Sequence, residues 1–469
     1  MNLPIFLGGE AVETAQRLAV TCSYDGGNAG STFLAGPAEL ERAIAVAQQA
    51  APALKALPAW KRHEILMGSA ARLRANRAEM GRLIALEACK PLRYALGEVD
   101  RALQVFEVAA EESRRMAGEY LRLDWTPAGT GRDAVVKWFP AGLVAGISPF
   151  NFPLNLAVHK VAPAFAAGCP IILKPSRNTP LSMLWMARLM AEAGLPAGAL
   201  SVLPLDRDSG TQLVTDPRFA VLTFTGSPEV GWWMKSQAGR KRVVLELGGN
   251  AGVIIDRTAD LAVAVPRIVT GAFAYAGQVC IHTQRIFVHE ALFVEFSRRF
   301  VAAAAKLRIG PPAEAETDVT ALIDEDSAKR VEAWVAEARE AGAQVLLGGR
   351  RNAAVYEPTI LTATRPEMRV CCDEVFGPVV TLEPFADFGD ALQRVNASRF
   401  GLQAGVFTDS LAHMQQAFDQ LDVGGVIIND TPTFRVDHMP YGGVKDSGLG
   451  REGVKYAMAD YLEMKVLVK

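Results

Sequence analysis

One cysteine stands where it could act as a nucleophile. Cys280 follows a Gly-Gln turn within Phe273–Arg285 (FAYAGQVCIHTQR) and precedes a run typical of a β-strand. Thiolates attack carbonyl groups readily, and a nearby helix end or polar N–H can lower the thiol pKa. A lone cysteine is more often a small buried hydrophobic residue, so its role depends on what other residues accompany it.

Two further segments contain partners for such chemistry. Glu246 ends an apolar run and precedes two glycines (LELGGN), which permit close backbone approach. A carboxylate in a partly apolar place is a usable general base. Asn151 is braced by two prolines in ISPFNFP, and an amide fixed in this way can donate to a developing oxyanion. The alternatives are a solvent-exposed Glu at a strand end and an Asn that satisfies its own turn.

Two other segments could bind phosphate. Ser227, in FTGSPEVG, follows an apolar run and opens a predicted helix, where backbone N–H groups are available to an anion. The segment is not the G-x-G-x-x-G dinucleotide fingerprint. Lys174 and Arg177, in ILKPSRNTP, stand at the C-terminal end of a predicted strand, where open α/β sheets bind ligands. A serine N-cap and a solvated basic loop are the alternatives.

The elements that must position these segments alternate along the chain. From residue 141, short apolar runs alternate with helical stretches, and a second alternation runs from about residue 253 to 430. Continuous apolar strands between helices predict parallel sheets covered on both faces. Residues 38–118 have helical periodicity, and 119–139 are typical of two strands around a turn segment.

Length and composition exclude several classes of protein. The 469 residues exceed a single core, which predicts two or three domains. A net charge of -2 gives no gross attraction to nucleic acid or an anionic membrane, and the uncharged stretch 138–158 contains helix-breaking prolines. The six cysteines form no C-x-x-C pair and the histidines are scattered, so we expect no metal. The N-terminus lacks the pattern of a signal peptide, which predicts a cytoplasmic protein.

Taken together, these segments resemble the aldehyde dehydrogenase superfamily over essentially the whole chain. Two more motifs carry the resemblance: Glu374-Val-Phe376-Gly-Pro and the run from Gly442 to Glu452 (GGVKDSGLGRE). The implied fold is α/β, with two doubly wound lobes and a small β oligomerisation element. The implied domains are a Rossmann-like cofactor domain (1–118 and 140–247), a catalytic domain (248–450) and the oligomerisation element (119–139 and 451–469).

The resemblance also implies a mechanism. Cys280 would attack an aldehyde to give a thiohemiacetal, and Asn151 with the backbone N–H of Cys280 would hold the oxyanion. Hydride transfer would leave a thioester, and Glu246 would activate the water that hydrolyses it. Lys160 and Glu452 match positions linked to a proton path, with a structural ion pair as the alternative.

The cofactor implied is NADP or NAD. The positions that would contact it are Lys174, Ser176, Arg177, Gly226, Ser227, Gly248, Glu374 and Phe376. Many NAD-preferring relatives have a Glu at the position of Arg177, and an arginine can instead pair with a 2′-phosphate. The sequence therefore predicts NADP preference, or use of both cofactors, unless Arg177 simply points into solvent.

The substrate channel has an unusual number of polar positions. The candidate substrate residues are Arg101, Phe152, Asn155, His159, Arg285 and Arg435. Several cations near a thiol suggest a small anionic or hydroxylated aldehyde, and the motifs look most like bacterial lactaldehyde, phosphonoacetaldehyde and glyceraldehyde-3-phosphate dehydrogenases. The alternative is that these cations form local ion pairs with Glu98, Asp100 or Asp437.

The same residues bear on two other functions and on the assembly. Relatives that acylate coenzyme A usually lack the base at Glu246, and a catalytically silent binding protein would be expected to have lost Cys280, Glu246 or Asn151. All three are present. Strands near 120–139 and at 461–469 are predicted edge strands, which suggests pairing between subunits in a homodimer or homotetramer.

Overall fold

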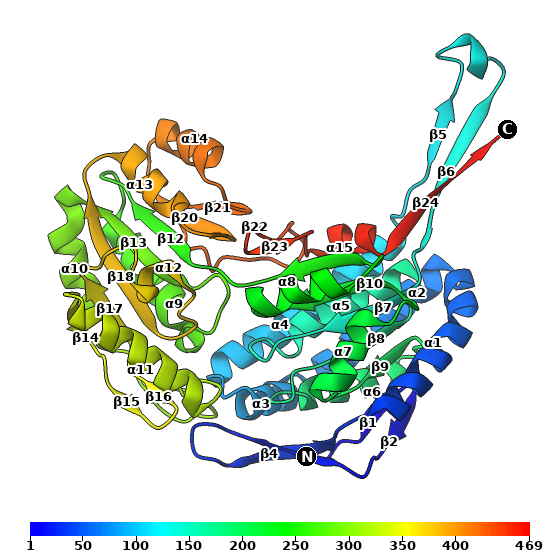
Figure 1. Cartoon of the computed structure of the whole chain (residues 1–469), viewed down its shortest axis with the longest axis horizontal. Helices are drawn as coiled ribbons and strands as arrows, with labels where there is room; N and C mark the ends of the chain where they lie inside the picture. Colours follow the sequence, from blue (N-terminus) through cyan, green and yellow to red (C-terminus); the bar gives the residue numbers. More distant parts are fainter.

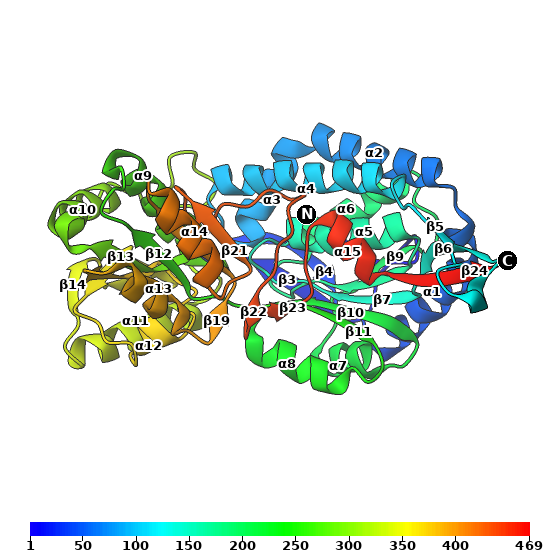
Figure 2. The same ribbon diagram turned by 90° about the horizontal axis from the view of Figure 1, so that it is seen from above.

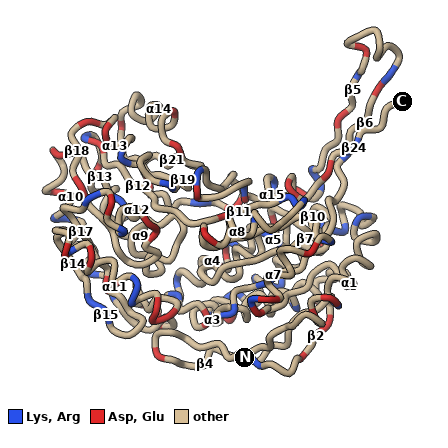
Figure 3. The backbone as a smooth tube through the Cα atoms, in the orientation of Figure 1, with Lys and Arg blue, Asp and Glu red and all other residues tan.

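The computed structural model describes all residues from Met1 to Lys469. Figure 1 shows two lobes side by side and a long β arm that projects from one of them. Figure 3 shows acidic and basic residues interspersed along the backbone of both lobes. No helix has the length and apolar character needed to cross a lipid bilayer.

The first lobe is built on an eight-stranded sheet with the order β2-β1-β9-β8-β7-β10-β11-β23. Its strands are β1 (Ile5–Leu7), β2 (Glu10–Val12), β7 (Leu143–Ile147), β8 (Ile171–Lys174), β9 (Leu200–Val202), β10 (Phe219–Thr225), β11 (Arg242–Glu246) and β23 (Gly448–Leu449). The five strands from β9 to β11 run parallel, and the outer strands are antiparallel. Gly448–Leu449 lies in the range predicted for the catalytic domain but pairs with β11 of the first lobe.

Helices cover both faces of this sheet, as its continuous apolar strands require. On one face lie α2 (Ala59–Ala75), α3 (Arg77–Glu87), α4 (Leu92–Ser113), α5 (Asn155–Ala167) and α6 (Leu181–Glu192); on the other lie α1 (Pro37–Ala56), α7 (Arg207–Thr215) and α8 (Pro228–Gln237). Successive strand residues alternate between the two faces: Val144 packs with the first group and Ala145 with the second.

The second lobe contains a seven-stranded sheet with the order β14-β17-β18-β13-β12-β20-β21. Its strands are β12 (Ala251–Ile255), β13 (Thr283–His289), β14 (Gln344–Leu347), β17 (Thr359–Thr362), β18 (Val379–Phe385), β20 (Gln403–Phe407) and β21 (Gly425–Ile428). All neighbours are parallel except β14 with β17. One face is covered by α9 (Leu261–Phe273), α10 (Glu290–Ala304), α11 (Glu325–Glu340) and α12 (Arg369–Cys372), and the other by α13 (Phe388–Asn396) and α14 (Leu411–Gln420). The prediction of an α/β fold with two such lobes is confirmed.

The arm is a three-stranded antiparallel sheet of β24 (Leu462–Val468), β6 (Asp133–Pro140) and β5 (Glu119–Arg122), with η1 (Pro127–Gly129) in its turn. It leaves large apolar side chains exposed, including Tyr120 and Met464. Its role in oligomerisation stays a prediction.

Short elements connect these parts. They are β3 (Arg17–Thr21), β4 (Asn28–Phe33), β15 (Arg351–Asn352), β16 (Val355–Tyr356), β19 (Phe400–Gly401), β22 (Val444–Lys445), α15 (Val454–Asp460) and η2 (Ala274–Gly277). The stretch 138–158, examined for membrane-spanning character, forms the end of β6, the buried strand β7, a loop and the start of α5.

Candidate active site

A cavity of ≈ 740 Å³ opens where the two lobes meet. The first lobe lines it with residues that follow the C-terminal ends of β7, β8, β10 and β11, and the second lobe adds Cys280 and the segment around Glu374. The carboxyl ends of parallel strands are where open α/β sheets bind ligands. Cys280, Glu246 and Asn151, which are far apart in sequence, all line this one cavity.

A strained turn precedes Cys280. Tyr275, Ala276 and Gly277 all have left-handed backbone conformations, with φ of 51°, 52° and 70°. For a residue other than glycine this region costs about 1–2 kcal/mol, so the turn must be held by its surroundings. The Tyr275 hydroxyl donates to the carbonyl of Ala88 at 2.6 Å and is buried. A side chain at Gly277 would overlap the carbonyl of Gly377.

The Cys280 thiol has one polar partner in the protein. Its Sγ lies 2.8 Å from the Tyr441 hydroxyl, and the guanidinium of Arg435 lies 3.7 Å from the centre of the Tyr441 ring. Burial raises the pKa of Cys280 to about 12, while the Tyr441 hydrogen bond and the charge of Arg435 oppose that rise. The thiolate is therefore stabilised by this pair of side chains.

Asn151 lies in the loop after β7, and its Nδ2 donates to the carbonyl of Gln278 at 2.9 Å. This bond joins the first lobe to the segment that carries Cys280. Helix α5 begins just beyond, where the N–H groups of Leu154 and Asn155 both donate to the buried carboxylate of Glu98. The Asn151 amide is thus positioned beside a helix start that is itself capped by a charge.

Glu246, at the end of β11, is buried and neither of its carboxylate oxygens has a hydrogen-bond partner in the protein. Burial, followed by the charge of Glu452, raises its pKa well above the usual value. The glycines around it are required by packing: a Cβ on Gly442 would lie 2.8 Å from Glu246 Oε1, and one on Gly249 would overlap the carbonyl oxygen of Cys280. A buried carboxylate whose pKa is raised in this way suits a general base, because it can hold the proton it receives.

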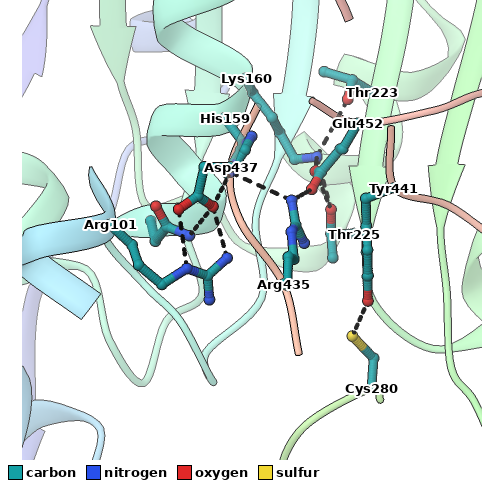
Figure 4. Close-up of polar contacts among 11 residues, drawn as sticks. Arg101, His159, Lys160, Thr223, Thr225, Cys280, Arg435, Asp437, Tyr441 and Glu452 are labelled. Atoms are coloured by element: carbon teal, nitrogen blue, oxygen red, sulfur yellow. Dashed lines mark hydrogen bonds and ion pairs between the residues drawn. The ribbon is translucent and has the colours of Figure 1, made fainter. Parts of the chain in front are cut away.

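A buried network around Lys160 and Glu452 (Figure 4) lies close enough to Glu246 to affect its pKa. Lys160 Nζ donates to Thr225 Oγ1 at 2.7 Å and to Thr223 Oγ1 at 3.2 Å, and it lies 3.4 Å from Glu452 Oε1. Burial alone would raise the pKa of Glu452, but the charges of Lys160 and Arg435 lower it to about 2. The ion-pair alternative is thus present in the structure, and the proton path stays a prediction.

The polar channel residues converge on Asp437. Arg101 donates to its two oxygens at 2.7 and 3.1 Å, His159 lies at 2.8 Å, and Asn155 Nδ2 lies at 3.4 Å. Arg101 and His159 therefore form the local ion pairs that were the alternative to substrate binding. Burial lowers the pKa of His159, so its imidazole is neutral at pH 7.

Arg435 retains unused donors. One terminal nitrogen lies 2.9 Å from Glu452 Oε2 and 3.3 Å from His159 Nε2. Its Nε is buried and has no partner in the protein. Figure 4 shows Arg435 between the Asp437 cluster and Tyr441, which itself reaches Cys280.

None of the six predicted substrate residues lines the cavity. Arg101, Asn155, His159 and Arg435 lie in the network around Asp437, and the other two lie elsewhere. Arg285 was predicted to lie near the thiol, and this is wrong: it is buried in β13 and donates to the carbonyls of Asn250, Arg394 and Val395. Phe152 packs against the ammonium of Lys90, which lies 3.8 Å from its ring centre, and its ring does not line the cavity.

The predicted cofactor residues all line the cavity: Lys174, Ser176, Arg177, Gly226, Ser227, Gly248, Glu374 and Phe376. Neither Lys174 nor Arg177 forms an ion pair within 4 Å, although the nearby Asp206 carboxylate interacts electrostatically with both. Their donors are therefore available to a phosphate group. Glu374 accepts a hydrogen bond from Gly249 N at 3.0 Å, and burial raises its pKa to about 7. A Cβ at Gly248 would overlap the Glu374 carboxylate, so glycine is needed there. These donors and the carboxylate fit a dinucleotide with a ribose.

Sequence reasoning did not assign a role to Tyr441. The residue was visible beside the Gly442-Gly motif, but its contact with Cys280 spans 161 residues and no local spacing reveals it. Asp437 was named only as a possible ion-pair partner, and the structure makes it the acceptor that joins Arg101 to His159.

Comparison with known proteins gives matches along nearly the whole chain. The model of the aldehyde dehydrogenase family matches residues 11–467. A 3-sulfolactaldehyde dehydrogenase of Priestia megaterium is 41% identical over 465 residues, which cover 99% of this chain and 97% of that protein. The crystal structure of aldehyde dehydrogenase 21 from Physcomitrella patens, in complex with the reaction product succinate, has a TM-score of 0.98 and 45% identity, covering 100% of this chain and 98% of that one. Glyceraldehyde-3-phosphate dehydrogenase GapN from Methanocaldococcus jannaschii, complexed with NADP, has a TM-score of 0.92 and 35% identity, covering 96% and 98%.

Proposed function

Because this chain belongs to the aldehyde dehydrogenase family, we propose that Cys280, Glu246 and Asn151 carry out its reaction on a small anionic aldehyde. The reaction class is NAD(P)-dependent oxidation of an aldehyde to the carboxylic acid.

Cys280 begins the reaction by adding its sulfur to the aldehyde carbon. The C–S bond forms while the carbonyl π electrons move to oxygen, giving a thiohemiacetal oxyanion. One N–H of Asn151 Nδ2 donates to the carbonyl of Gln278. Its other N–H and the backbone N–H of Cys280 would donate to the oxyanion, and the hydrogen bond from Tyr441 keeps the thiolate available. The strained turn before Cys280 holds the sulfur toward the cavity.

Lys174, Arg177 and Ser227 would hold the phosphates of NAD(P), and Glu374 would accept from a ribose hydroxyl. When bound, this cofactor supplies an acceptor for the hydride that leaves the carbon attached to Cys280. Arg177 lines the cavity and forms no ion pair within 4 Å, although Asp206 is nearby, and a guanidinium can pair with the 2′-phosphate that distinguishes NADP from NAD. We therefore propose that NADP is preferred.

Glu246 then takes a proton from water, which attacks the thioester carbon. The C–S bond breaks, the carboxylic acid is released and Cys280 leaves as thiolate. Glu246 is suited to this step because burial keeps its pKa high enough to hold the proton it receives. Lys160 and Glu452 lie in the polar network behind it and offer a route for that proton.

The guanidinium of Arg435 is the observation that carries the substrate proposal. Its Nε is buried and has no partner in the protein, while one terminal nitrogen is paired with Glu452. Arg101 and Lys160 belong to the same network, paired with Asp437 and Glu452. A guanidinium with a donor to spare near the nucleophile favours an anionic substrate.

Several relatives act on aldehydes of this kind. They include a 3-sulfolactaldehyde dehydrogenase and a glyceraldehyde-3-phosphate dehydrogenase, and the structure of aldehyde dehydrogenase 21 holds the dicarboxylate succinate as product. These three compounds are small and carry an anionic group besides the reacting carbon, whereas two other relatives are dehydrogenases of uncharged lactaldehyde. We propose that Arg435, with Arg101 beyond it, recognises that group through its unused donors.

The test measures reduced-cofactor formation by the purified protein with NADP and with NAD. The aldehydes are 3-sulfolactaldehyde, phosphonoacetaldehyde, glyceraldehyde-3-phosphate, succinate semialdehyde, uncharged lactaldehyde and hexanal, and Cys280→Ala is the inactive control. NADP with an anionic aldehyde should give the highest kcat/KM. Highest efficiency with NAD and hexanal would overturn both specificity proposals, and turnover only with coenzyme A would move the acylating alternative forward.

A variant tests the recognising cation. In Arg435→Met, the ratio of kcat/KM for the best anionic aldehyde to that for lactaldehyde should fall about 10–100-fold, as expected for a lost hydrogen bond to a charged group. The ratio corrects for any general damage, since Arg435 also contacts Glu452. Arg399→Met is the matched control, because it removes a guanidinium that does line the cavity. An unchanged ratio in Arg435→Met would contradict the assignment.

The assembly is proposed on separate grounds. Strand β5 ends the arm sheet with an unpaired edge and exposed apolar side chains, and such an edge favours pairing with another subunit. We propose a homodimer or homotetramer, and light scattering that gave a monomer would contradict this. The cytoplasmic location stays a prediction.

A further inference from the structure

Two thiols outside the cavity lie in contact where the lobes meet. Cys22, in the connection between β3 and β4, has its Sγ 3.6 Å from that of Cys89, which follows α3. Both side chains are buried, and Ala321 and Ala354 of the second lobe pack against them. The reaction proposed above uses neither thiol.

The backbone at Cys89 is unusual. Its φ is 45°, in the left-handed region that a residue with a Cβ rarely adopts. The chain on either side is held in place: the carbonyl of Ala88 accepts from Tyr275, and Lys90 N donates to the carbonyl of Ala85. A strained position next to a second thiol is one where function is worth seeking.

The pair has the proximity that a disulfide requires. A disulfide S–S bond is about 2.05 Å long, so the sulfurs at 3.6 Å need to approach by only about 1.5 Å. The two residues come from segments 67 positions apart, so their contact is set by the fold. Cys89 Sγ also lies 3.6 Å from Thr320 Oγ1.

The surroundings favour a reactive thiol at Cys89. The hydrogen bond from Cys22 lowers the pKa of Cys89, against the effect of burial, and the hydroxyls of Ser23 and Thr320 act in the same direction. Cys22 also lines a cavity of ≈ 550 Å³, and the buried Cys89 lies behind it with its Sγ 3.6 Å from that of Cys22. Thiolate character and access are what select the cysteines that oxidants modify.

We propose that Cys22 and Cys89 form a redox modification site, which a hydroperoxide converts to an intramolecular disulfide. The Cys89 thiolate attacks the O–O bond, giving a sulfenic acid and water after protonation of the leaving hydroxide. Cys22 sulfur then attacks the sulfenic sulfur, the S–O bond breaks and a second water leaves. Two thiols lose two electrons, the peroxide gains them, and a dithiol reductant reverses the change.

The other cysteines supply the controls. Cys169 Sγ donates to the carbonyl of Tyr461 in the core of the first lobe, Cys280 is the proposed nucleophile, and Cys371 and Cys372 are adjacent in α12. A change in the mass of the intact protein therefore does not show which cysteines were oxidised, so peptide mapping is required.

The experiment uses the full chain with Cys280→Ser, so that oxidation of the nucleophile does not compete. The folded protein is treated with hydrogen peroxide, free thiols are alkylated, and the protein is digested with trypsin. Peptides Leu18–Arg42 and Leu83–Arg93, which contain Cys22 and Cys89 as their only cysteines, should be recovered cross-linked. Their joint mass should be about 2 Da below the sum of the reduced peptides, and dithiothreitol should separate them.

Two variants test whether the cross-link depends on Cys22. In Cys22→Ser the cross-link should be absent and Cys89 should accumulate as a sulfenic acid that dimedone traps, whereas Cys372→Ser should leave the cross-link unchanged. Recovery of Cys22 and Cys89 as free alkylated thiols, at peroxide doses that fully oxidise Cys280 in the unsubstituted protein, would overturn the proposal. A disulfide found only at Cys371–Cys372 would also overturn it.

Discussion

Removing one hydroxyl group tests how the nucleophile is activated. Tyr441→Phe deletes the hydrogen bond to Cys280 Sγ, which is 2.8 Å long, and keeps the ring on which Arg435 packs. The substitution therefore separates the hydrogen bond from the cation that also lowers the pKa of Cys280.

The expected size follows from the energy of that bond. A hydrogen bond to a charged group contributes about 1.5–3 kcal/mol, and one pKa unit corresponds to about 1.4 kcal/mol. The pKa of the Cys280 thiol should therefore rise by about 1–2 units, and the thiolate fraction at neutral pH should fall about 10–100-fold. A more basic thiolate is also more nucleophilic, with a Brønsted coefficient of about 0.4–0.5. On a logarithmic scale, this gain in reactivity offsets roughly half of the loss in thiolate fraction. We expect a net loss of about 3–10-fold in kcat/KM.

The assay follows the thiol directly. Iodoacetamide is reacted with the cofactor-free protein across a range of pH, and modification of the tryptic peptide Ile268–Arg285, whose only cysteine is Cys280, is quantified. Because the lost hydrogen bond stabilised the thiolate, the rise of the rate with pH should move to higher pH in Tyr441→Phe. The same shift should appear in the pH profile of kcat/KM for lactaldehyde.

Tyr356→Phe is the matched control for this measurement. The Tyr356 hydroxyl is buried without a partner in β16, and the residue does not line the cavity. The control should keep the profile of the unsubstituted protein. If Tyr441→Phe also kept that profile, the hydroxyl would not stabilise the thiolate, and the activation argued here would be refuted.

Three other substitutions have defined outcomes. Gly249→Ala places a Cβ against the carbonyl of Cys280, so kcat should fall by about 100-fold while the NADP Kd, measured by fluorescence, changes little. Arg177→Ala should lower the ratio of kcat/KM with NADP to that with NAD by about 10–100-fold, and an unchanged ratio would mean that Arg177 points into solvent. The pKa of Glu452 is lowered to about 2 in the folded state, so its stabilisation is complete above pH 4.5 and is lost as the pH falls toward 2. Urea titrations at pH 4.5 and 3.5 would compare the free energy of unfolding of the unsubstituted protein with that of Glu452→Gln. The difference should be about 1 kcal/mol smaller at pH 3.5, and a constant difference would contradict the lowered pKa.

Most of the fold could be predicted because parallel strands buried on both faces leave a strong pattern. The run Leu143–Ile147 is apolar at every position and forms β7, whose residues alternate between two helix layers. The two-residue strand Gly448–Leu449 could not be predicted, since it exists only through its pairing with Leu245 and Glu246. Its apolar content is too small to show periodicity.

The site could be predicted where chemistry depends on residue type within a motif. Glu246 with two glycines and Asn151 between two prolines have local features that packing alone explains poorly, and both line the cavity. Contacts between distant segments are different in kind. Tyr441 meets Cys280, and Arg101 meets Asp437 across 336 residues, through the arrangement of the lobes.

Two arginines show that the distance in sequence between a cation and a nucleophile does not reveal whether the two meet in the structure. Arg285 is five residues from Cys280, but β13 rises by about 3.3 Å per residue and carries it away from the cavity. There its donors are taken up by three backbone carbonyls, and burial lowers its pKa to about 10. Arg435 is 155 positions from Cys280 in the sequence, yet it packs on the ring of Tyr441 and keeps a buried Nε without a partner. A cation whose donors are satisfied by the fold stabilises the fold, and one with donors to spare beside the nucleophile can select a substrate.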